Sequence, residues 1–181
     1  RQEDAAEFLQ MHLLREEASP TLSNLTKSYG KSVLICAHCS RPREATAEEF
    51  QTFEVPIELS GPDIEEPIRF TDVQSAFNAF LTDGYNDFQY LCSHCQHNQW
   101  TKALQMVEFP ELLVLTLKRY RTVRLESGKL EQRCVTHPVA TTDVLDFQGQ
   151  LYDLRSVIVH FSDTMIAGHY IALAKHETDT G

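Results

Sequence analysis

Apolar residues recur at helical spacing in two segments of the chain. Behind Asp4, a residue able to cap a helix, they predict a helix over residues 4–13. The apolar positions of this helix are Ala5, Phe8, Leu9 and Leu13. From residue 71 onward apolar residues follow at i, i+3, i+4, i+7 and i+8, which predicts a second helix capped by Thr71 or Asp72. Its apolar positions are Val73, Ala76, Phe77, Phe80 and Leu81.

Strand-like patterns dominate the rest of the chain. Over residues 53–59 apolar residues alternate with polar ones or proline, which predicts a half-buried strand, and Pro56 places it at a sheet edge. A β-rich run, Lys31–Cys36, leads into a first pair of cysteines. Further strands are predicted over residues 103–107, 112–120, 152–160 and 169–175. Helices followed by antiparallel sheet predict an α+β domain.

Composition narrows the class of protein. The 181 residues suffice for one domain with a sizeable core, because 42% of them are hydrophobic, and this excludes a disordered or fibrous protein. No stretch approaches the roughly 20 apolar residues that span a bilayer, and the N-terminus lacks the layout of a secretory signal. We therefore expect an intracellular protein, cytoplasmic or nuclear, with no membrane partner. Because the chain opens at Arg1 directly on a helical pattern, we also expect it to be truncated.

The formal net charge of −10 bears on the partners of the protein. It argues against a nucleic acid, because phosphate contacts need clustered Lys and Arg. It favours a basic partner, although most excess charge only solvates a surface. The sequence does not indicate an oligomeric state.

Four of the five cysteines form two pairs with the spacing of zinc knuckles. Two residues separate Cys36 from Cys39 and Cys92 from Cys95, so both thiolates of each pair can face one tetrahedral metal ion. Without a secretory signal this pattern favours metal over disulfides and predicts a shared structural zinc. Redox pairs of the thioredoxin type are the main alternative, but such pairs normally occur singly on a strand-to-helix turn.

Three further side chains with metal-binding or nucleophilic potential lie near these patterns. His38 and His94 stand inside the two knuckles, where four cysteines leave them as bystanders, although either could be a ligand. Cys134 precedes a β-like segment with no helix N-terminus or base nearby, which predicts a buried structural thiol rather than a nucleophile.

A glycine and a histidine stand at the start of the last predicted strand. Gly168 gives the backbone freedom on the loop side, and His169 begins a rigid element, an arrangement that suits a positioned general base. Taken alone, a histidine at a strand end is more often a structural or surface residue.

Four motifs occur in one order along the chain. Residues 2–9 read Gln-Glu-Asp-Ala-Ala-Glu-Phe-Leu, and the two cysteine pairs follow. Residues 115–120 read Leu-Thr-Leu-Lys-Arg-Tyr. The last motif opens with Tyr-Asp-Leu at residues 152–154 and ends with Gly-His-Tyr-Ile-Ala at residues 168–172. Together these motifs resemble the glutamine box, zinc fingers, Leu-Lys-Arg-aromatic strand and histidine box of the ubiquitin-specific proteases, a family of papain-like cysteine proteases. Each motif alone could arise by chance, but the ordered set is specific and spans nearly the whole chain.

The resemblance implies a papain-like α+β fold in three parts. These are part of a helical lobe over residues 1–30, zinc-bearing fingers over 31–100 and an antiparallel palm with the histidine box over 101–181. It also implies a deubiquitinase, a cysteine protease that hydrolyses the (iso)peptide bond after the C-terminal glycine of ubiquitin. Ubiquitin and ubiquitinated proteins would be its partners, and zinc its structural cofactor.

The same resemblance implies roles for five residues. His169 would take the proton from a cysteine thiol. Gly168 would leave a narrow channel for the Gly-Gly end of the ubiquitin tail, and Tyr170 would also bind substrate. Asp4 and Glu7, one helical turn apart, would hold the arginines and backbone N–H groups of that tail. The alternatives are a helix cap for Asp4 and a solvated position for Glu7.

The chain also departs from the family pattern. The cysteine box should precede Arg1 and the third triad residue should follow the last strand, so we expect the isolated chain to be inactive. Asp179 is not assigned that triad role, because no aromatic-rich strand leads into it. Ser162 stands where the family usually has glycine, and Ala6 replaces a larger polar residue. A non-catalytic ubiquitin-binding pseudo-protease and a zinc-finger interaction module therefore stay open as alternatives.

Overall fold

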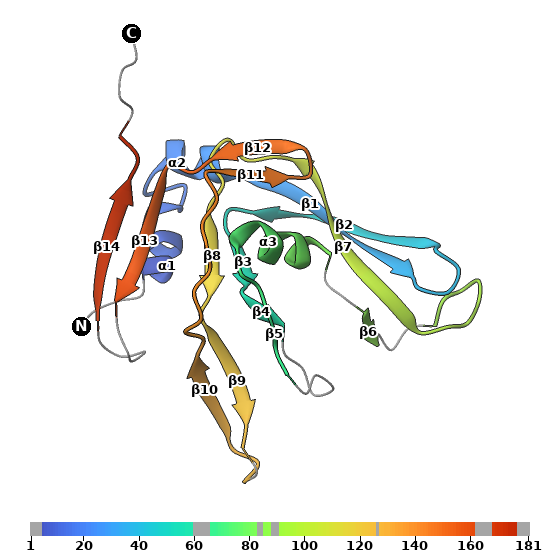
Figure 1. The fold of residues 1–181 in the computed structure, drawn as a ribbon. Helices are drawn as coiled ribbons and strands as arrows, with labels where there is room; N and C mark the ends of the chain where they lie inside the picture. Colours follow the sequence, from blue (N-terminus) through green and yellow to red (C-terminus); the bar gives the residue numbers. More distant parts are fainter. Residues whose placement is uncertain are drawn as a thin grey trace.

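The largest sheet of the protein has four antiparallel strands in the order β2–β1–β7–β6, here called the fingers sheet. The computed structural model describes residues 5–59, 66–82, 85–87, 91–125, 127–161 and 168–176. The strands of the fingers sheet are β1 (Ser28–Cys36), β2 (Pro42–Phe50), β6 (Tyr85–Asp87) and β7 (Gln99–Glu108). This sheet extends to one side of the molecule, on the right of Figure 1.

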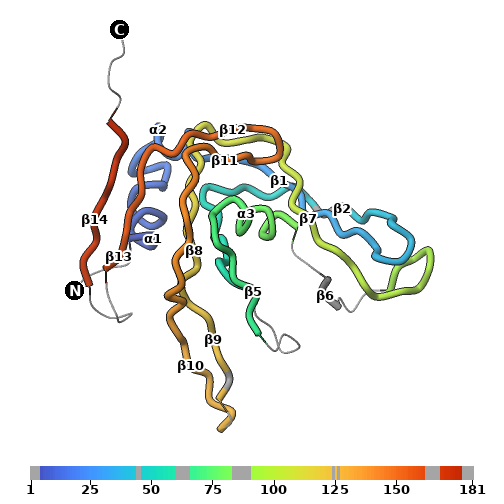
Figure 2. Tube along the Cα trace, in the orientation of Figure 1, coloured from blue at the N-terminus to red at the C-terminus, as the bar shows by residue number. Residues whose placement is uncertain are grey.

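Shorter strand pairs make up the other β-structure of the described residues. They are β3 (Phe53–Pro56) with β8 (Leu115–Lys118), β4 (Glu58–Leu59) with β5 (Ile68–Arg69), β9 (Tyr120–Arg124) with β10 (Leu130–Cys134), β11 (Val144–Phe147) with β12 (Gln150–Asp153), and β13 (Ser156–Phe161) with β14 (His169–Ala174). All of these pairs are antiparallel except β3–β8, which is parallel. The β13–β14 hairpin lies on the side of the molecule opposite the fingers sheet, as the chain trace in Figure 2 shows.

Both predicted helices are present. Helix α3 (Val73–Leu81) is capped by Asp72 rather than Thr71, because the Asp72 side chain accepts a hydrogen bond from the Ser75 N–H at 2.8 Å. The first helix consists of α1 (Ala5–Phe8) and a π-helical turn η1 (Leu9–Leu13), while its predicted cap lies outside the described residues. None of the described helices is long and apolar enough to cross a membrane.

A third helix, α2 (Pro20–Thr26), escapes sequence prediction because its buried face is polar. Ser23 and Thr26 are at most 1% exposed, so no apolar period marks the segment. Their hydroxyl groups are satisfied inside the protein. The Thr26 hydroxyl donates to the Leu22 carbonyl at 3.0 Å, and the Gln51 side-chain amide donates to the Ser23 hydroxyl at 2.9 Å. Such bonds remove the cost of burying polar groups.

The main core packs helix α3 against strands β3 and β11. Three phenylalanines, Phe53, Phe77 and Phe147, are at most 1% exposed. Their rings meet edge to face with centroid separations of 4.8 to 6.1 Å, which is the arrangement that aromatic quadrupoles favour. A separate cluster of buried side chains, Trp100 with the first cysteine of each pair, lies in the fingers.

The prediction of one strand over residues 152–160 is wrong. The chain forms β12 and then β13, joined through Leu154 and Arg155. At this point the Leu154 N–H donates to the Asp143 carbonyl, and the Arg155 carbonyl accepts from the Lys175 N–H, both at 2.8 Å. The chain therefore changes its pairing partner from β11 to β14, a tertiary effect that local alternation does not encode.

Candidate metal centre and active-site histidine

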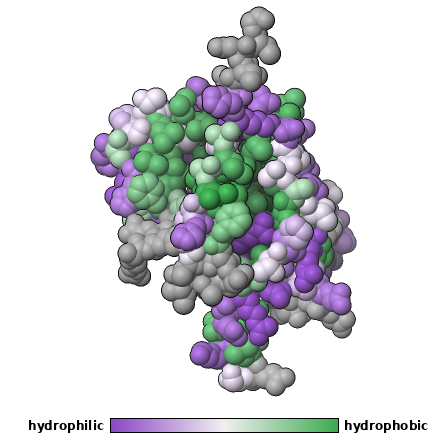
Figure 3. All heavy atoms as spheres, turned by 60° about the vertical axis from the view of Figure 1, so that its left-hand side comes forward, coloured by the Kyte–Doolittle hydropathy of each residue, from purple (hydrophilic) through white to green (hydrophobic). Residues whose placement is uncertain are grey.

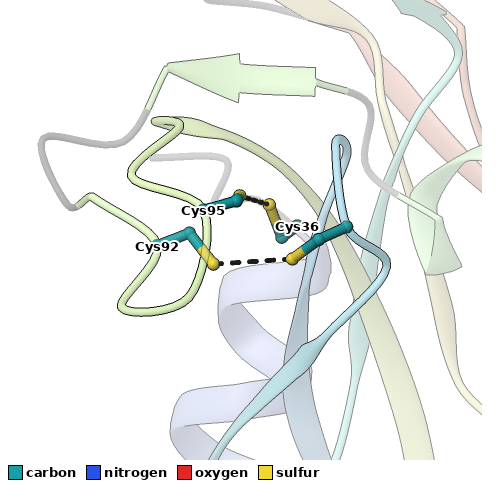
Figure 4. Close-up of side chains that lie close together, drawn as sticks. Cys36, Cys92 and Cys95 are labelled. Carbon is teal, nitrogen blue, oxygen red and sulfur yellow. Dashed lines mark hydrogen bonds between the residues drawn. The ribbon is translucent and has the colours of Figure 1, made fainter.

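The fold brings the four paired cysteines together, as the sequence predicts. Cys36 ends strand β1, and the second pair lies in the loop just before β7. Because β1 and β7 run antiparallel with Cys36 opposite Trp100, both cysteine loops meet at the same end of the fingers sheet. Figure 4 shows the side chains of Cys36, Cys92 and Cys95 pointing toward one another from the two loops.

The spacing of the four sulfur atoms fits a tetrahedral metal ion. The Sγ atoms of Cys36 and Cys95 are 3.5 Å apart, and those of Cys39 and Cys92 are 3.7 Å apart. All four Sγ atoms lie within 4.8 Å of one another. A tetrahedral ion with metal–sulfur bonds of about 2.3 Å needs sulfur separations of about 3.8 Å. The four thiols can therefore hold one metal ion with little movement.

Backbone N–H groups of the loops favour thiolates at the first cysteine of each pair. Those of Cys95 and His94 lower the pKa of the Cys92 thiol to about 6. Those of Cys39 and His38 likewise lower the pKa of Cys36. At Cys95 a backbone N–H from His97 acts in the same direction, but burial and hydrogen bonds to the other three cysteines raise its pKa to about 12. Sulfurs this close cannot all ionise without a cation between them.

The two loops repeat one backbone design. In each, the residue after the second cysteine donates its N–H to the carbonyl of the first: Ser40 to Cys36 and Gln96 to Cys92, both at 2.8 Å. Ser40 and Gln96 have φ values of 56° and 62°, in the left-handed region that costs a non-glycine residue about 1–2 kcal/mol. Such strain persists only where surrounding contacts enforce it, which is typical of a functional loop.

Of the three histidines in the cysteine loops, two stack on each other beside Cys95 and the third does not. His38 is exposed and stacks on the exposed ring of His97, with centroids 3.8 Å apart and planes at 9°. The donor atoms of both rings lie within 4.8 Å of the Cys95 sulfur. His94, the counterpart of His38 in the second loop, belongs to neither donor group found in the described residues. In the sequence, His97 is marked only by its place two residues after Cys95.

His169 opens strand β14 on the β13–β14 hairpin. It pairs with Phe161 across the hairpin, and its side chain is exposed, while Gly168 before it is half-buried. Tyr170 points to the other face of the strand, where its ring lies 4.6 Å from that of His160. The side of the molecule that carries this hairpin gathers apolar side chains (Figure 3). The exposed large apolar side chains of this hairpin are Ile158, Phe161, Ile171 and Leu173.

Three of the other residues considered as candidates in the sequence lie outside the described part of the structure. Glu7 is exposed on α1, and Asp4 lies outside the described residues. Ser162 and Asp179 also lie outside the described residues.

The prediction that Cys134 is buried is wrong. Cys134 is exposed at the end of β10, a strand whose five residues are all exposed. Strand β10 pairs only with β9 in the described part of the chain, and all of its side chains stay exposed. The β pattern of this segment is confirmed, but burial of the strand requires a packing partner that the described residues do not place against it.

Arg119 has a structural role at the junction of strands β8 and β9. It interrupts the predicted strand over residues 112–120, which becomes β8 and β9 on either side of it. Its guanidinium donates to the carbonyls of His137 at 2.6 Å and Val135 at 3.5 Å, and its own carbonyl accepts from the Val135 N–H at 2.7 Å. Arg119 therefore fastens the segment after β10 to the β8–β9 junction.

Sequence comparison identifies relatives of this chain. The family model described as "Ubiquitin carboxyl-terminal hydrolase" matches residues 1–181. Ubiquitin carboxyl-terminal hydrolase 2 of Gallus gallus is 29% identical over 168 residues, which cover 89% of this chain and 45% of that protein. Ubiquitin carboxyl-terminal hydrolase 15 of Rattus norvegicus is 32% identical over 146 residues, which cover 75% of this chain and 14% of that protein.

Solved structures with a similar fold include chains of DUB modules. A chain of the SAGA DUB module bound to monoubiquitin superposes with a TM-score of 0.74 at 22% identity, covering 97% of this chain and 41% of that chain. The chain thus spans less than half the length of the relatives it matches. Its mixture of helices and antiparallel strands, with a four-cysteine cluster in the fingers, agrees with the predicted α+β architecture. The chain belongs to the ubiquitin carboxyl-terminal hydrolase family.

Proposed function

We propose that this chain is part of a cysteine-type deubiquitinase that hydrolyses (iso)peptide bonds after the C-terminal glycine of ubiquitin. The observation that carries the proposal is the match of the hydrolase family to all 181 residues. Structures of the SAGA DUB module bound to monoubiquitin or ubiquitin aldehyde have the same fold, which supports ubiquitin as the partner. The three-part division into helical lobe, fingers and palm belongs to this proposal.

His169 is the proposed general base. Its imidazole would take the proton of a cysteine thiol, and the thiolate would then attack the carbonyl carbon of the terminal glycine of ubiquitin. The amine would leave with a proton, and water would hydrolyse the thioester that remains. The exposure of His169 at the start of a hydrogen-bonded strand supports this role, because the ring is accessible while its backbone is fixed by β13.

The nucleophile is proposed to lie outside these 181 residues. Four of the five cysteines form the metal-binding cluster in the fingers, on the opposite side of the molecule from the β13–β14 hairpin (Figure 1). The fifth, Cys134, lies on the β9–β10 hairpin, which does not pair with β13 or β14. An isolated chain of this sequence would therefore be inactive.

Zinc is the proposed metal of the cysteine cluster, with a structural role. Four thiolates at tetrahedral spacing match the structural class of zinc sites and leave no position for a reacting water. Bound zinc would join the end of β1 to the loop before β7. The fingers sheet and the β13–β14 hairpin lie on opposite sides of the molecule (Figure 1), which argues against a direct part of this metal in catalysis.

Substrate binding is proposed at both flanks of the histidine. Gly168, without a side chain, would allow the Gly-Gly end of the ubiquitin tail to pass close to the backbone, and Tyr170 would line the site. Asp4 and Glu7 would bind the arginines of the tail. The net charge of −10 is consistent with a basic segment of the substrate.

The test uses the full-length protein and a fluorogenic ubiquitin C-terminal amide. We expect His169→Ala to lower kcat by about 10²–10⁴-fold, because general-base catalysis contributes that much, with ubiquitin affinity retained. His176→Ala is the matched control, since His176 is also exposed and follows the same strand. Undiminished turnover by His169→Ala would remove His169 from the mechanism. Ubiquitin binding without turnover by the unaltered protein would favour a pseudo-protease, and loss of both would favour a zinc-finger interaction module.

A further inference from the structure

A second group of metal-binding side chains lies beside the four-cysteine cluster. It consists of His38, Cys95 and His97, whose donor atoms lie within 4.8 Å of one another. Both histidines are exposed and Cys95 is half-buried. The group therefore shares one thiol with the four-cysteine cluster and has its other two donors on the solvent side.

Backbone hydrogen bonds hold the two histidines close together. The Ala37 N–H donates to the Gln99 carbonyl at 3.0 Å, which joins the first loop to the start of β7. The Cys92 N–H donates to the His97 carbonyl at 2.7 Å, which closes the second loop. These bonds fix the backbone on both sides of the stacked rings, so the approach of His38 to His97 is a property of the fold.

The tautomer of His97 leaves a nitrogen free for a metal. Its Nδ1 lies 3.0 Å from the Cys95 carbonyl oxygen, which can only accept, so Nδ1 carries the hydrogen. The Nε2 atom of a neutral ring then presents a lone pair. A histidine whose second nitrogen donates to a backbone carbonyl is the usual form of a metal ligand.

We propose that His38 and His97, with the Cys95 thiolate as a shared ligand, form a second metal position that binds a borderline divalent cation. Imidazole and thiolate donors suit Zn²⁺, Co²⁺ and Ni²⁺ rather than Mg²⁺ or Ca²⁺. A thiolate sulfur keeps lone pairs after binding one metal and can therefore bridge to a second. The rings must turn from their parallel stack so that their nitrogens converge, and their exposure to solvent leaves room for this.

This second position would differ from the first in affinity and coordination. It has three protein donors where the four-cysteine cluster has four, and solvent can fill the remaining position. We expect it to fill only after the first. The proposal rests on the proposed zinc site, because Cys95 belongs to both groups.

The test loads the full chain with one equivalent of Zn²⁺ and adds Co²⁺ under reduced, thiol-free conditions. Both metals are counted by mass spectrometry after desalting, and cobalt is followed by its visible absorption. We expect zinc to stay at one equivalent while one equivalent of cobalt is added. His38→Ala and His97→Ala should each weaken cobalt binding at least about tenfold and leave zinc in place. His94→Ala is the control, since it occupies the position of His38 in the other loop, and it should retain both metals.

Two results would overturn the second position while leaving the first intact. One is a total that stays at one metal per chain in excess cobalt, and the other is cobalt uptake unchanged by the His38→Ala and His97→Ala double variant. If the unaltered chain binds no zinc, and Cys36→Ser has the same metal content as the unaltered chain, the four-thiolate site is overturned as well.

Discussion

Removal of zinc should disorder the tip of the fingers, and the single tryptophan reports on it. Trp100 is 3% exposed and packs against Cys36 and Cys92, in a cluster separate from the phenylalanine core. A chelator that strips zinc, or Cys36→Ser, should therefore expose the indole to water. Its fluorescence emission should shift to longer wavelength.

The free-energy contributions at the tip of the fingers indicate that it is unstable without zinc. The two loops, residues 36–40 and 92–97, have 11 residues, and ordering each costs about 1–2 kcal/mol. Burial of Trp100 contributes about 4–6 kcal/mol, from roughly 150–250 Å² at about 25 cal/mol per Å². Five backbone hydrogen bonds of the loops add about 0.5–1.5 kcal/mol each. At mid-range these contributions fall short of the ordering cost, whereas a structural zinc contributes about 10–16 kcal/mol.

The assay follows tryptophan emission and far-ultraviolet circular dichroism during titration with a zinc chelator. The emission shift should be complete when one equivalent of zinc has left, and most of the β signal should persist, because the main core does not contain the cysteines. Cys134→Ser is the control and should keep its zinc, since Cys134 is exposed on β10. An indole that stays buried after complete removal of zinc would refute the reasoning.

Three further predictions follow from the same structure. At pH 7 zinc binding should release close to four protons, because a disordered tip returns the pKa of Cys92 from about 6 to its ordinary value near 9. Calorimetry in buffers of different ionisation enthalpy measures the number of protons released. Release of about three or fewer would mean that the Cys92 thiolate is already formed without metal. Arg119→Ala should lower the free energy of unfolding by about 1.5–3 kcal/mol in urea, since its bonds to the Val135 and His137 carbonyls are charge-assisted. Lys118→Ala removes an exposed ion pair with Glu54 and should lower the free energy of unfolding by less than about 1 kcal/mol. Equal losses for Arg119→Ala and Lys118→Ala would contradict the structural role of Arg119. Phe77→Ala should lower the free energy of unfolding by about 3–5 kcal/mol, because removal of a fully buried ring leaves a cavity. Phe8→Ala, at a side chain that is 47% exposed, should change the free energy of unfolding by less than about 1 kcal/mol. Similar losses for both variants would contradict the assignment of Phe77 to the core.

Features with a strong local cause could be predicted from the sequence. Helix α3 was predictable because a capping aspartate precedes an uninterrupted apolar period, and both act within nine residues. The cysteine cluster was predictable because two thiols separated by two residues suit one metal ion wherever the loops lie.

Features that depend on distant partners could not be predicted. Burial of Cys134 depended on whether another layer covers the β9–β10 hairpin, and the break at Leu154 depended on the change of partner from β11 to β14. The stacking of His97 on His38 requires the register between β1 and β7, which no local pattern specifies. Helix α2 was missed for a different reason, since polar hydrogen-bonded groups fill its buried face.

The most direct test of the proposed activity is the reaction of the full-length protein with a ubiquitin that carries an electrophile at its C-terminus. The account predicts one covalent adduct, mapped by peptide mass spectrometry to a cysteine outside these 181 residues, and slower adduct formation in His169→Ala. An adduct on any of the five cysteines of this chain, or none under conditions where ubiquitin binds, would contradict it.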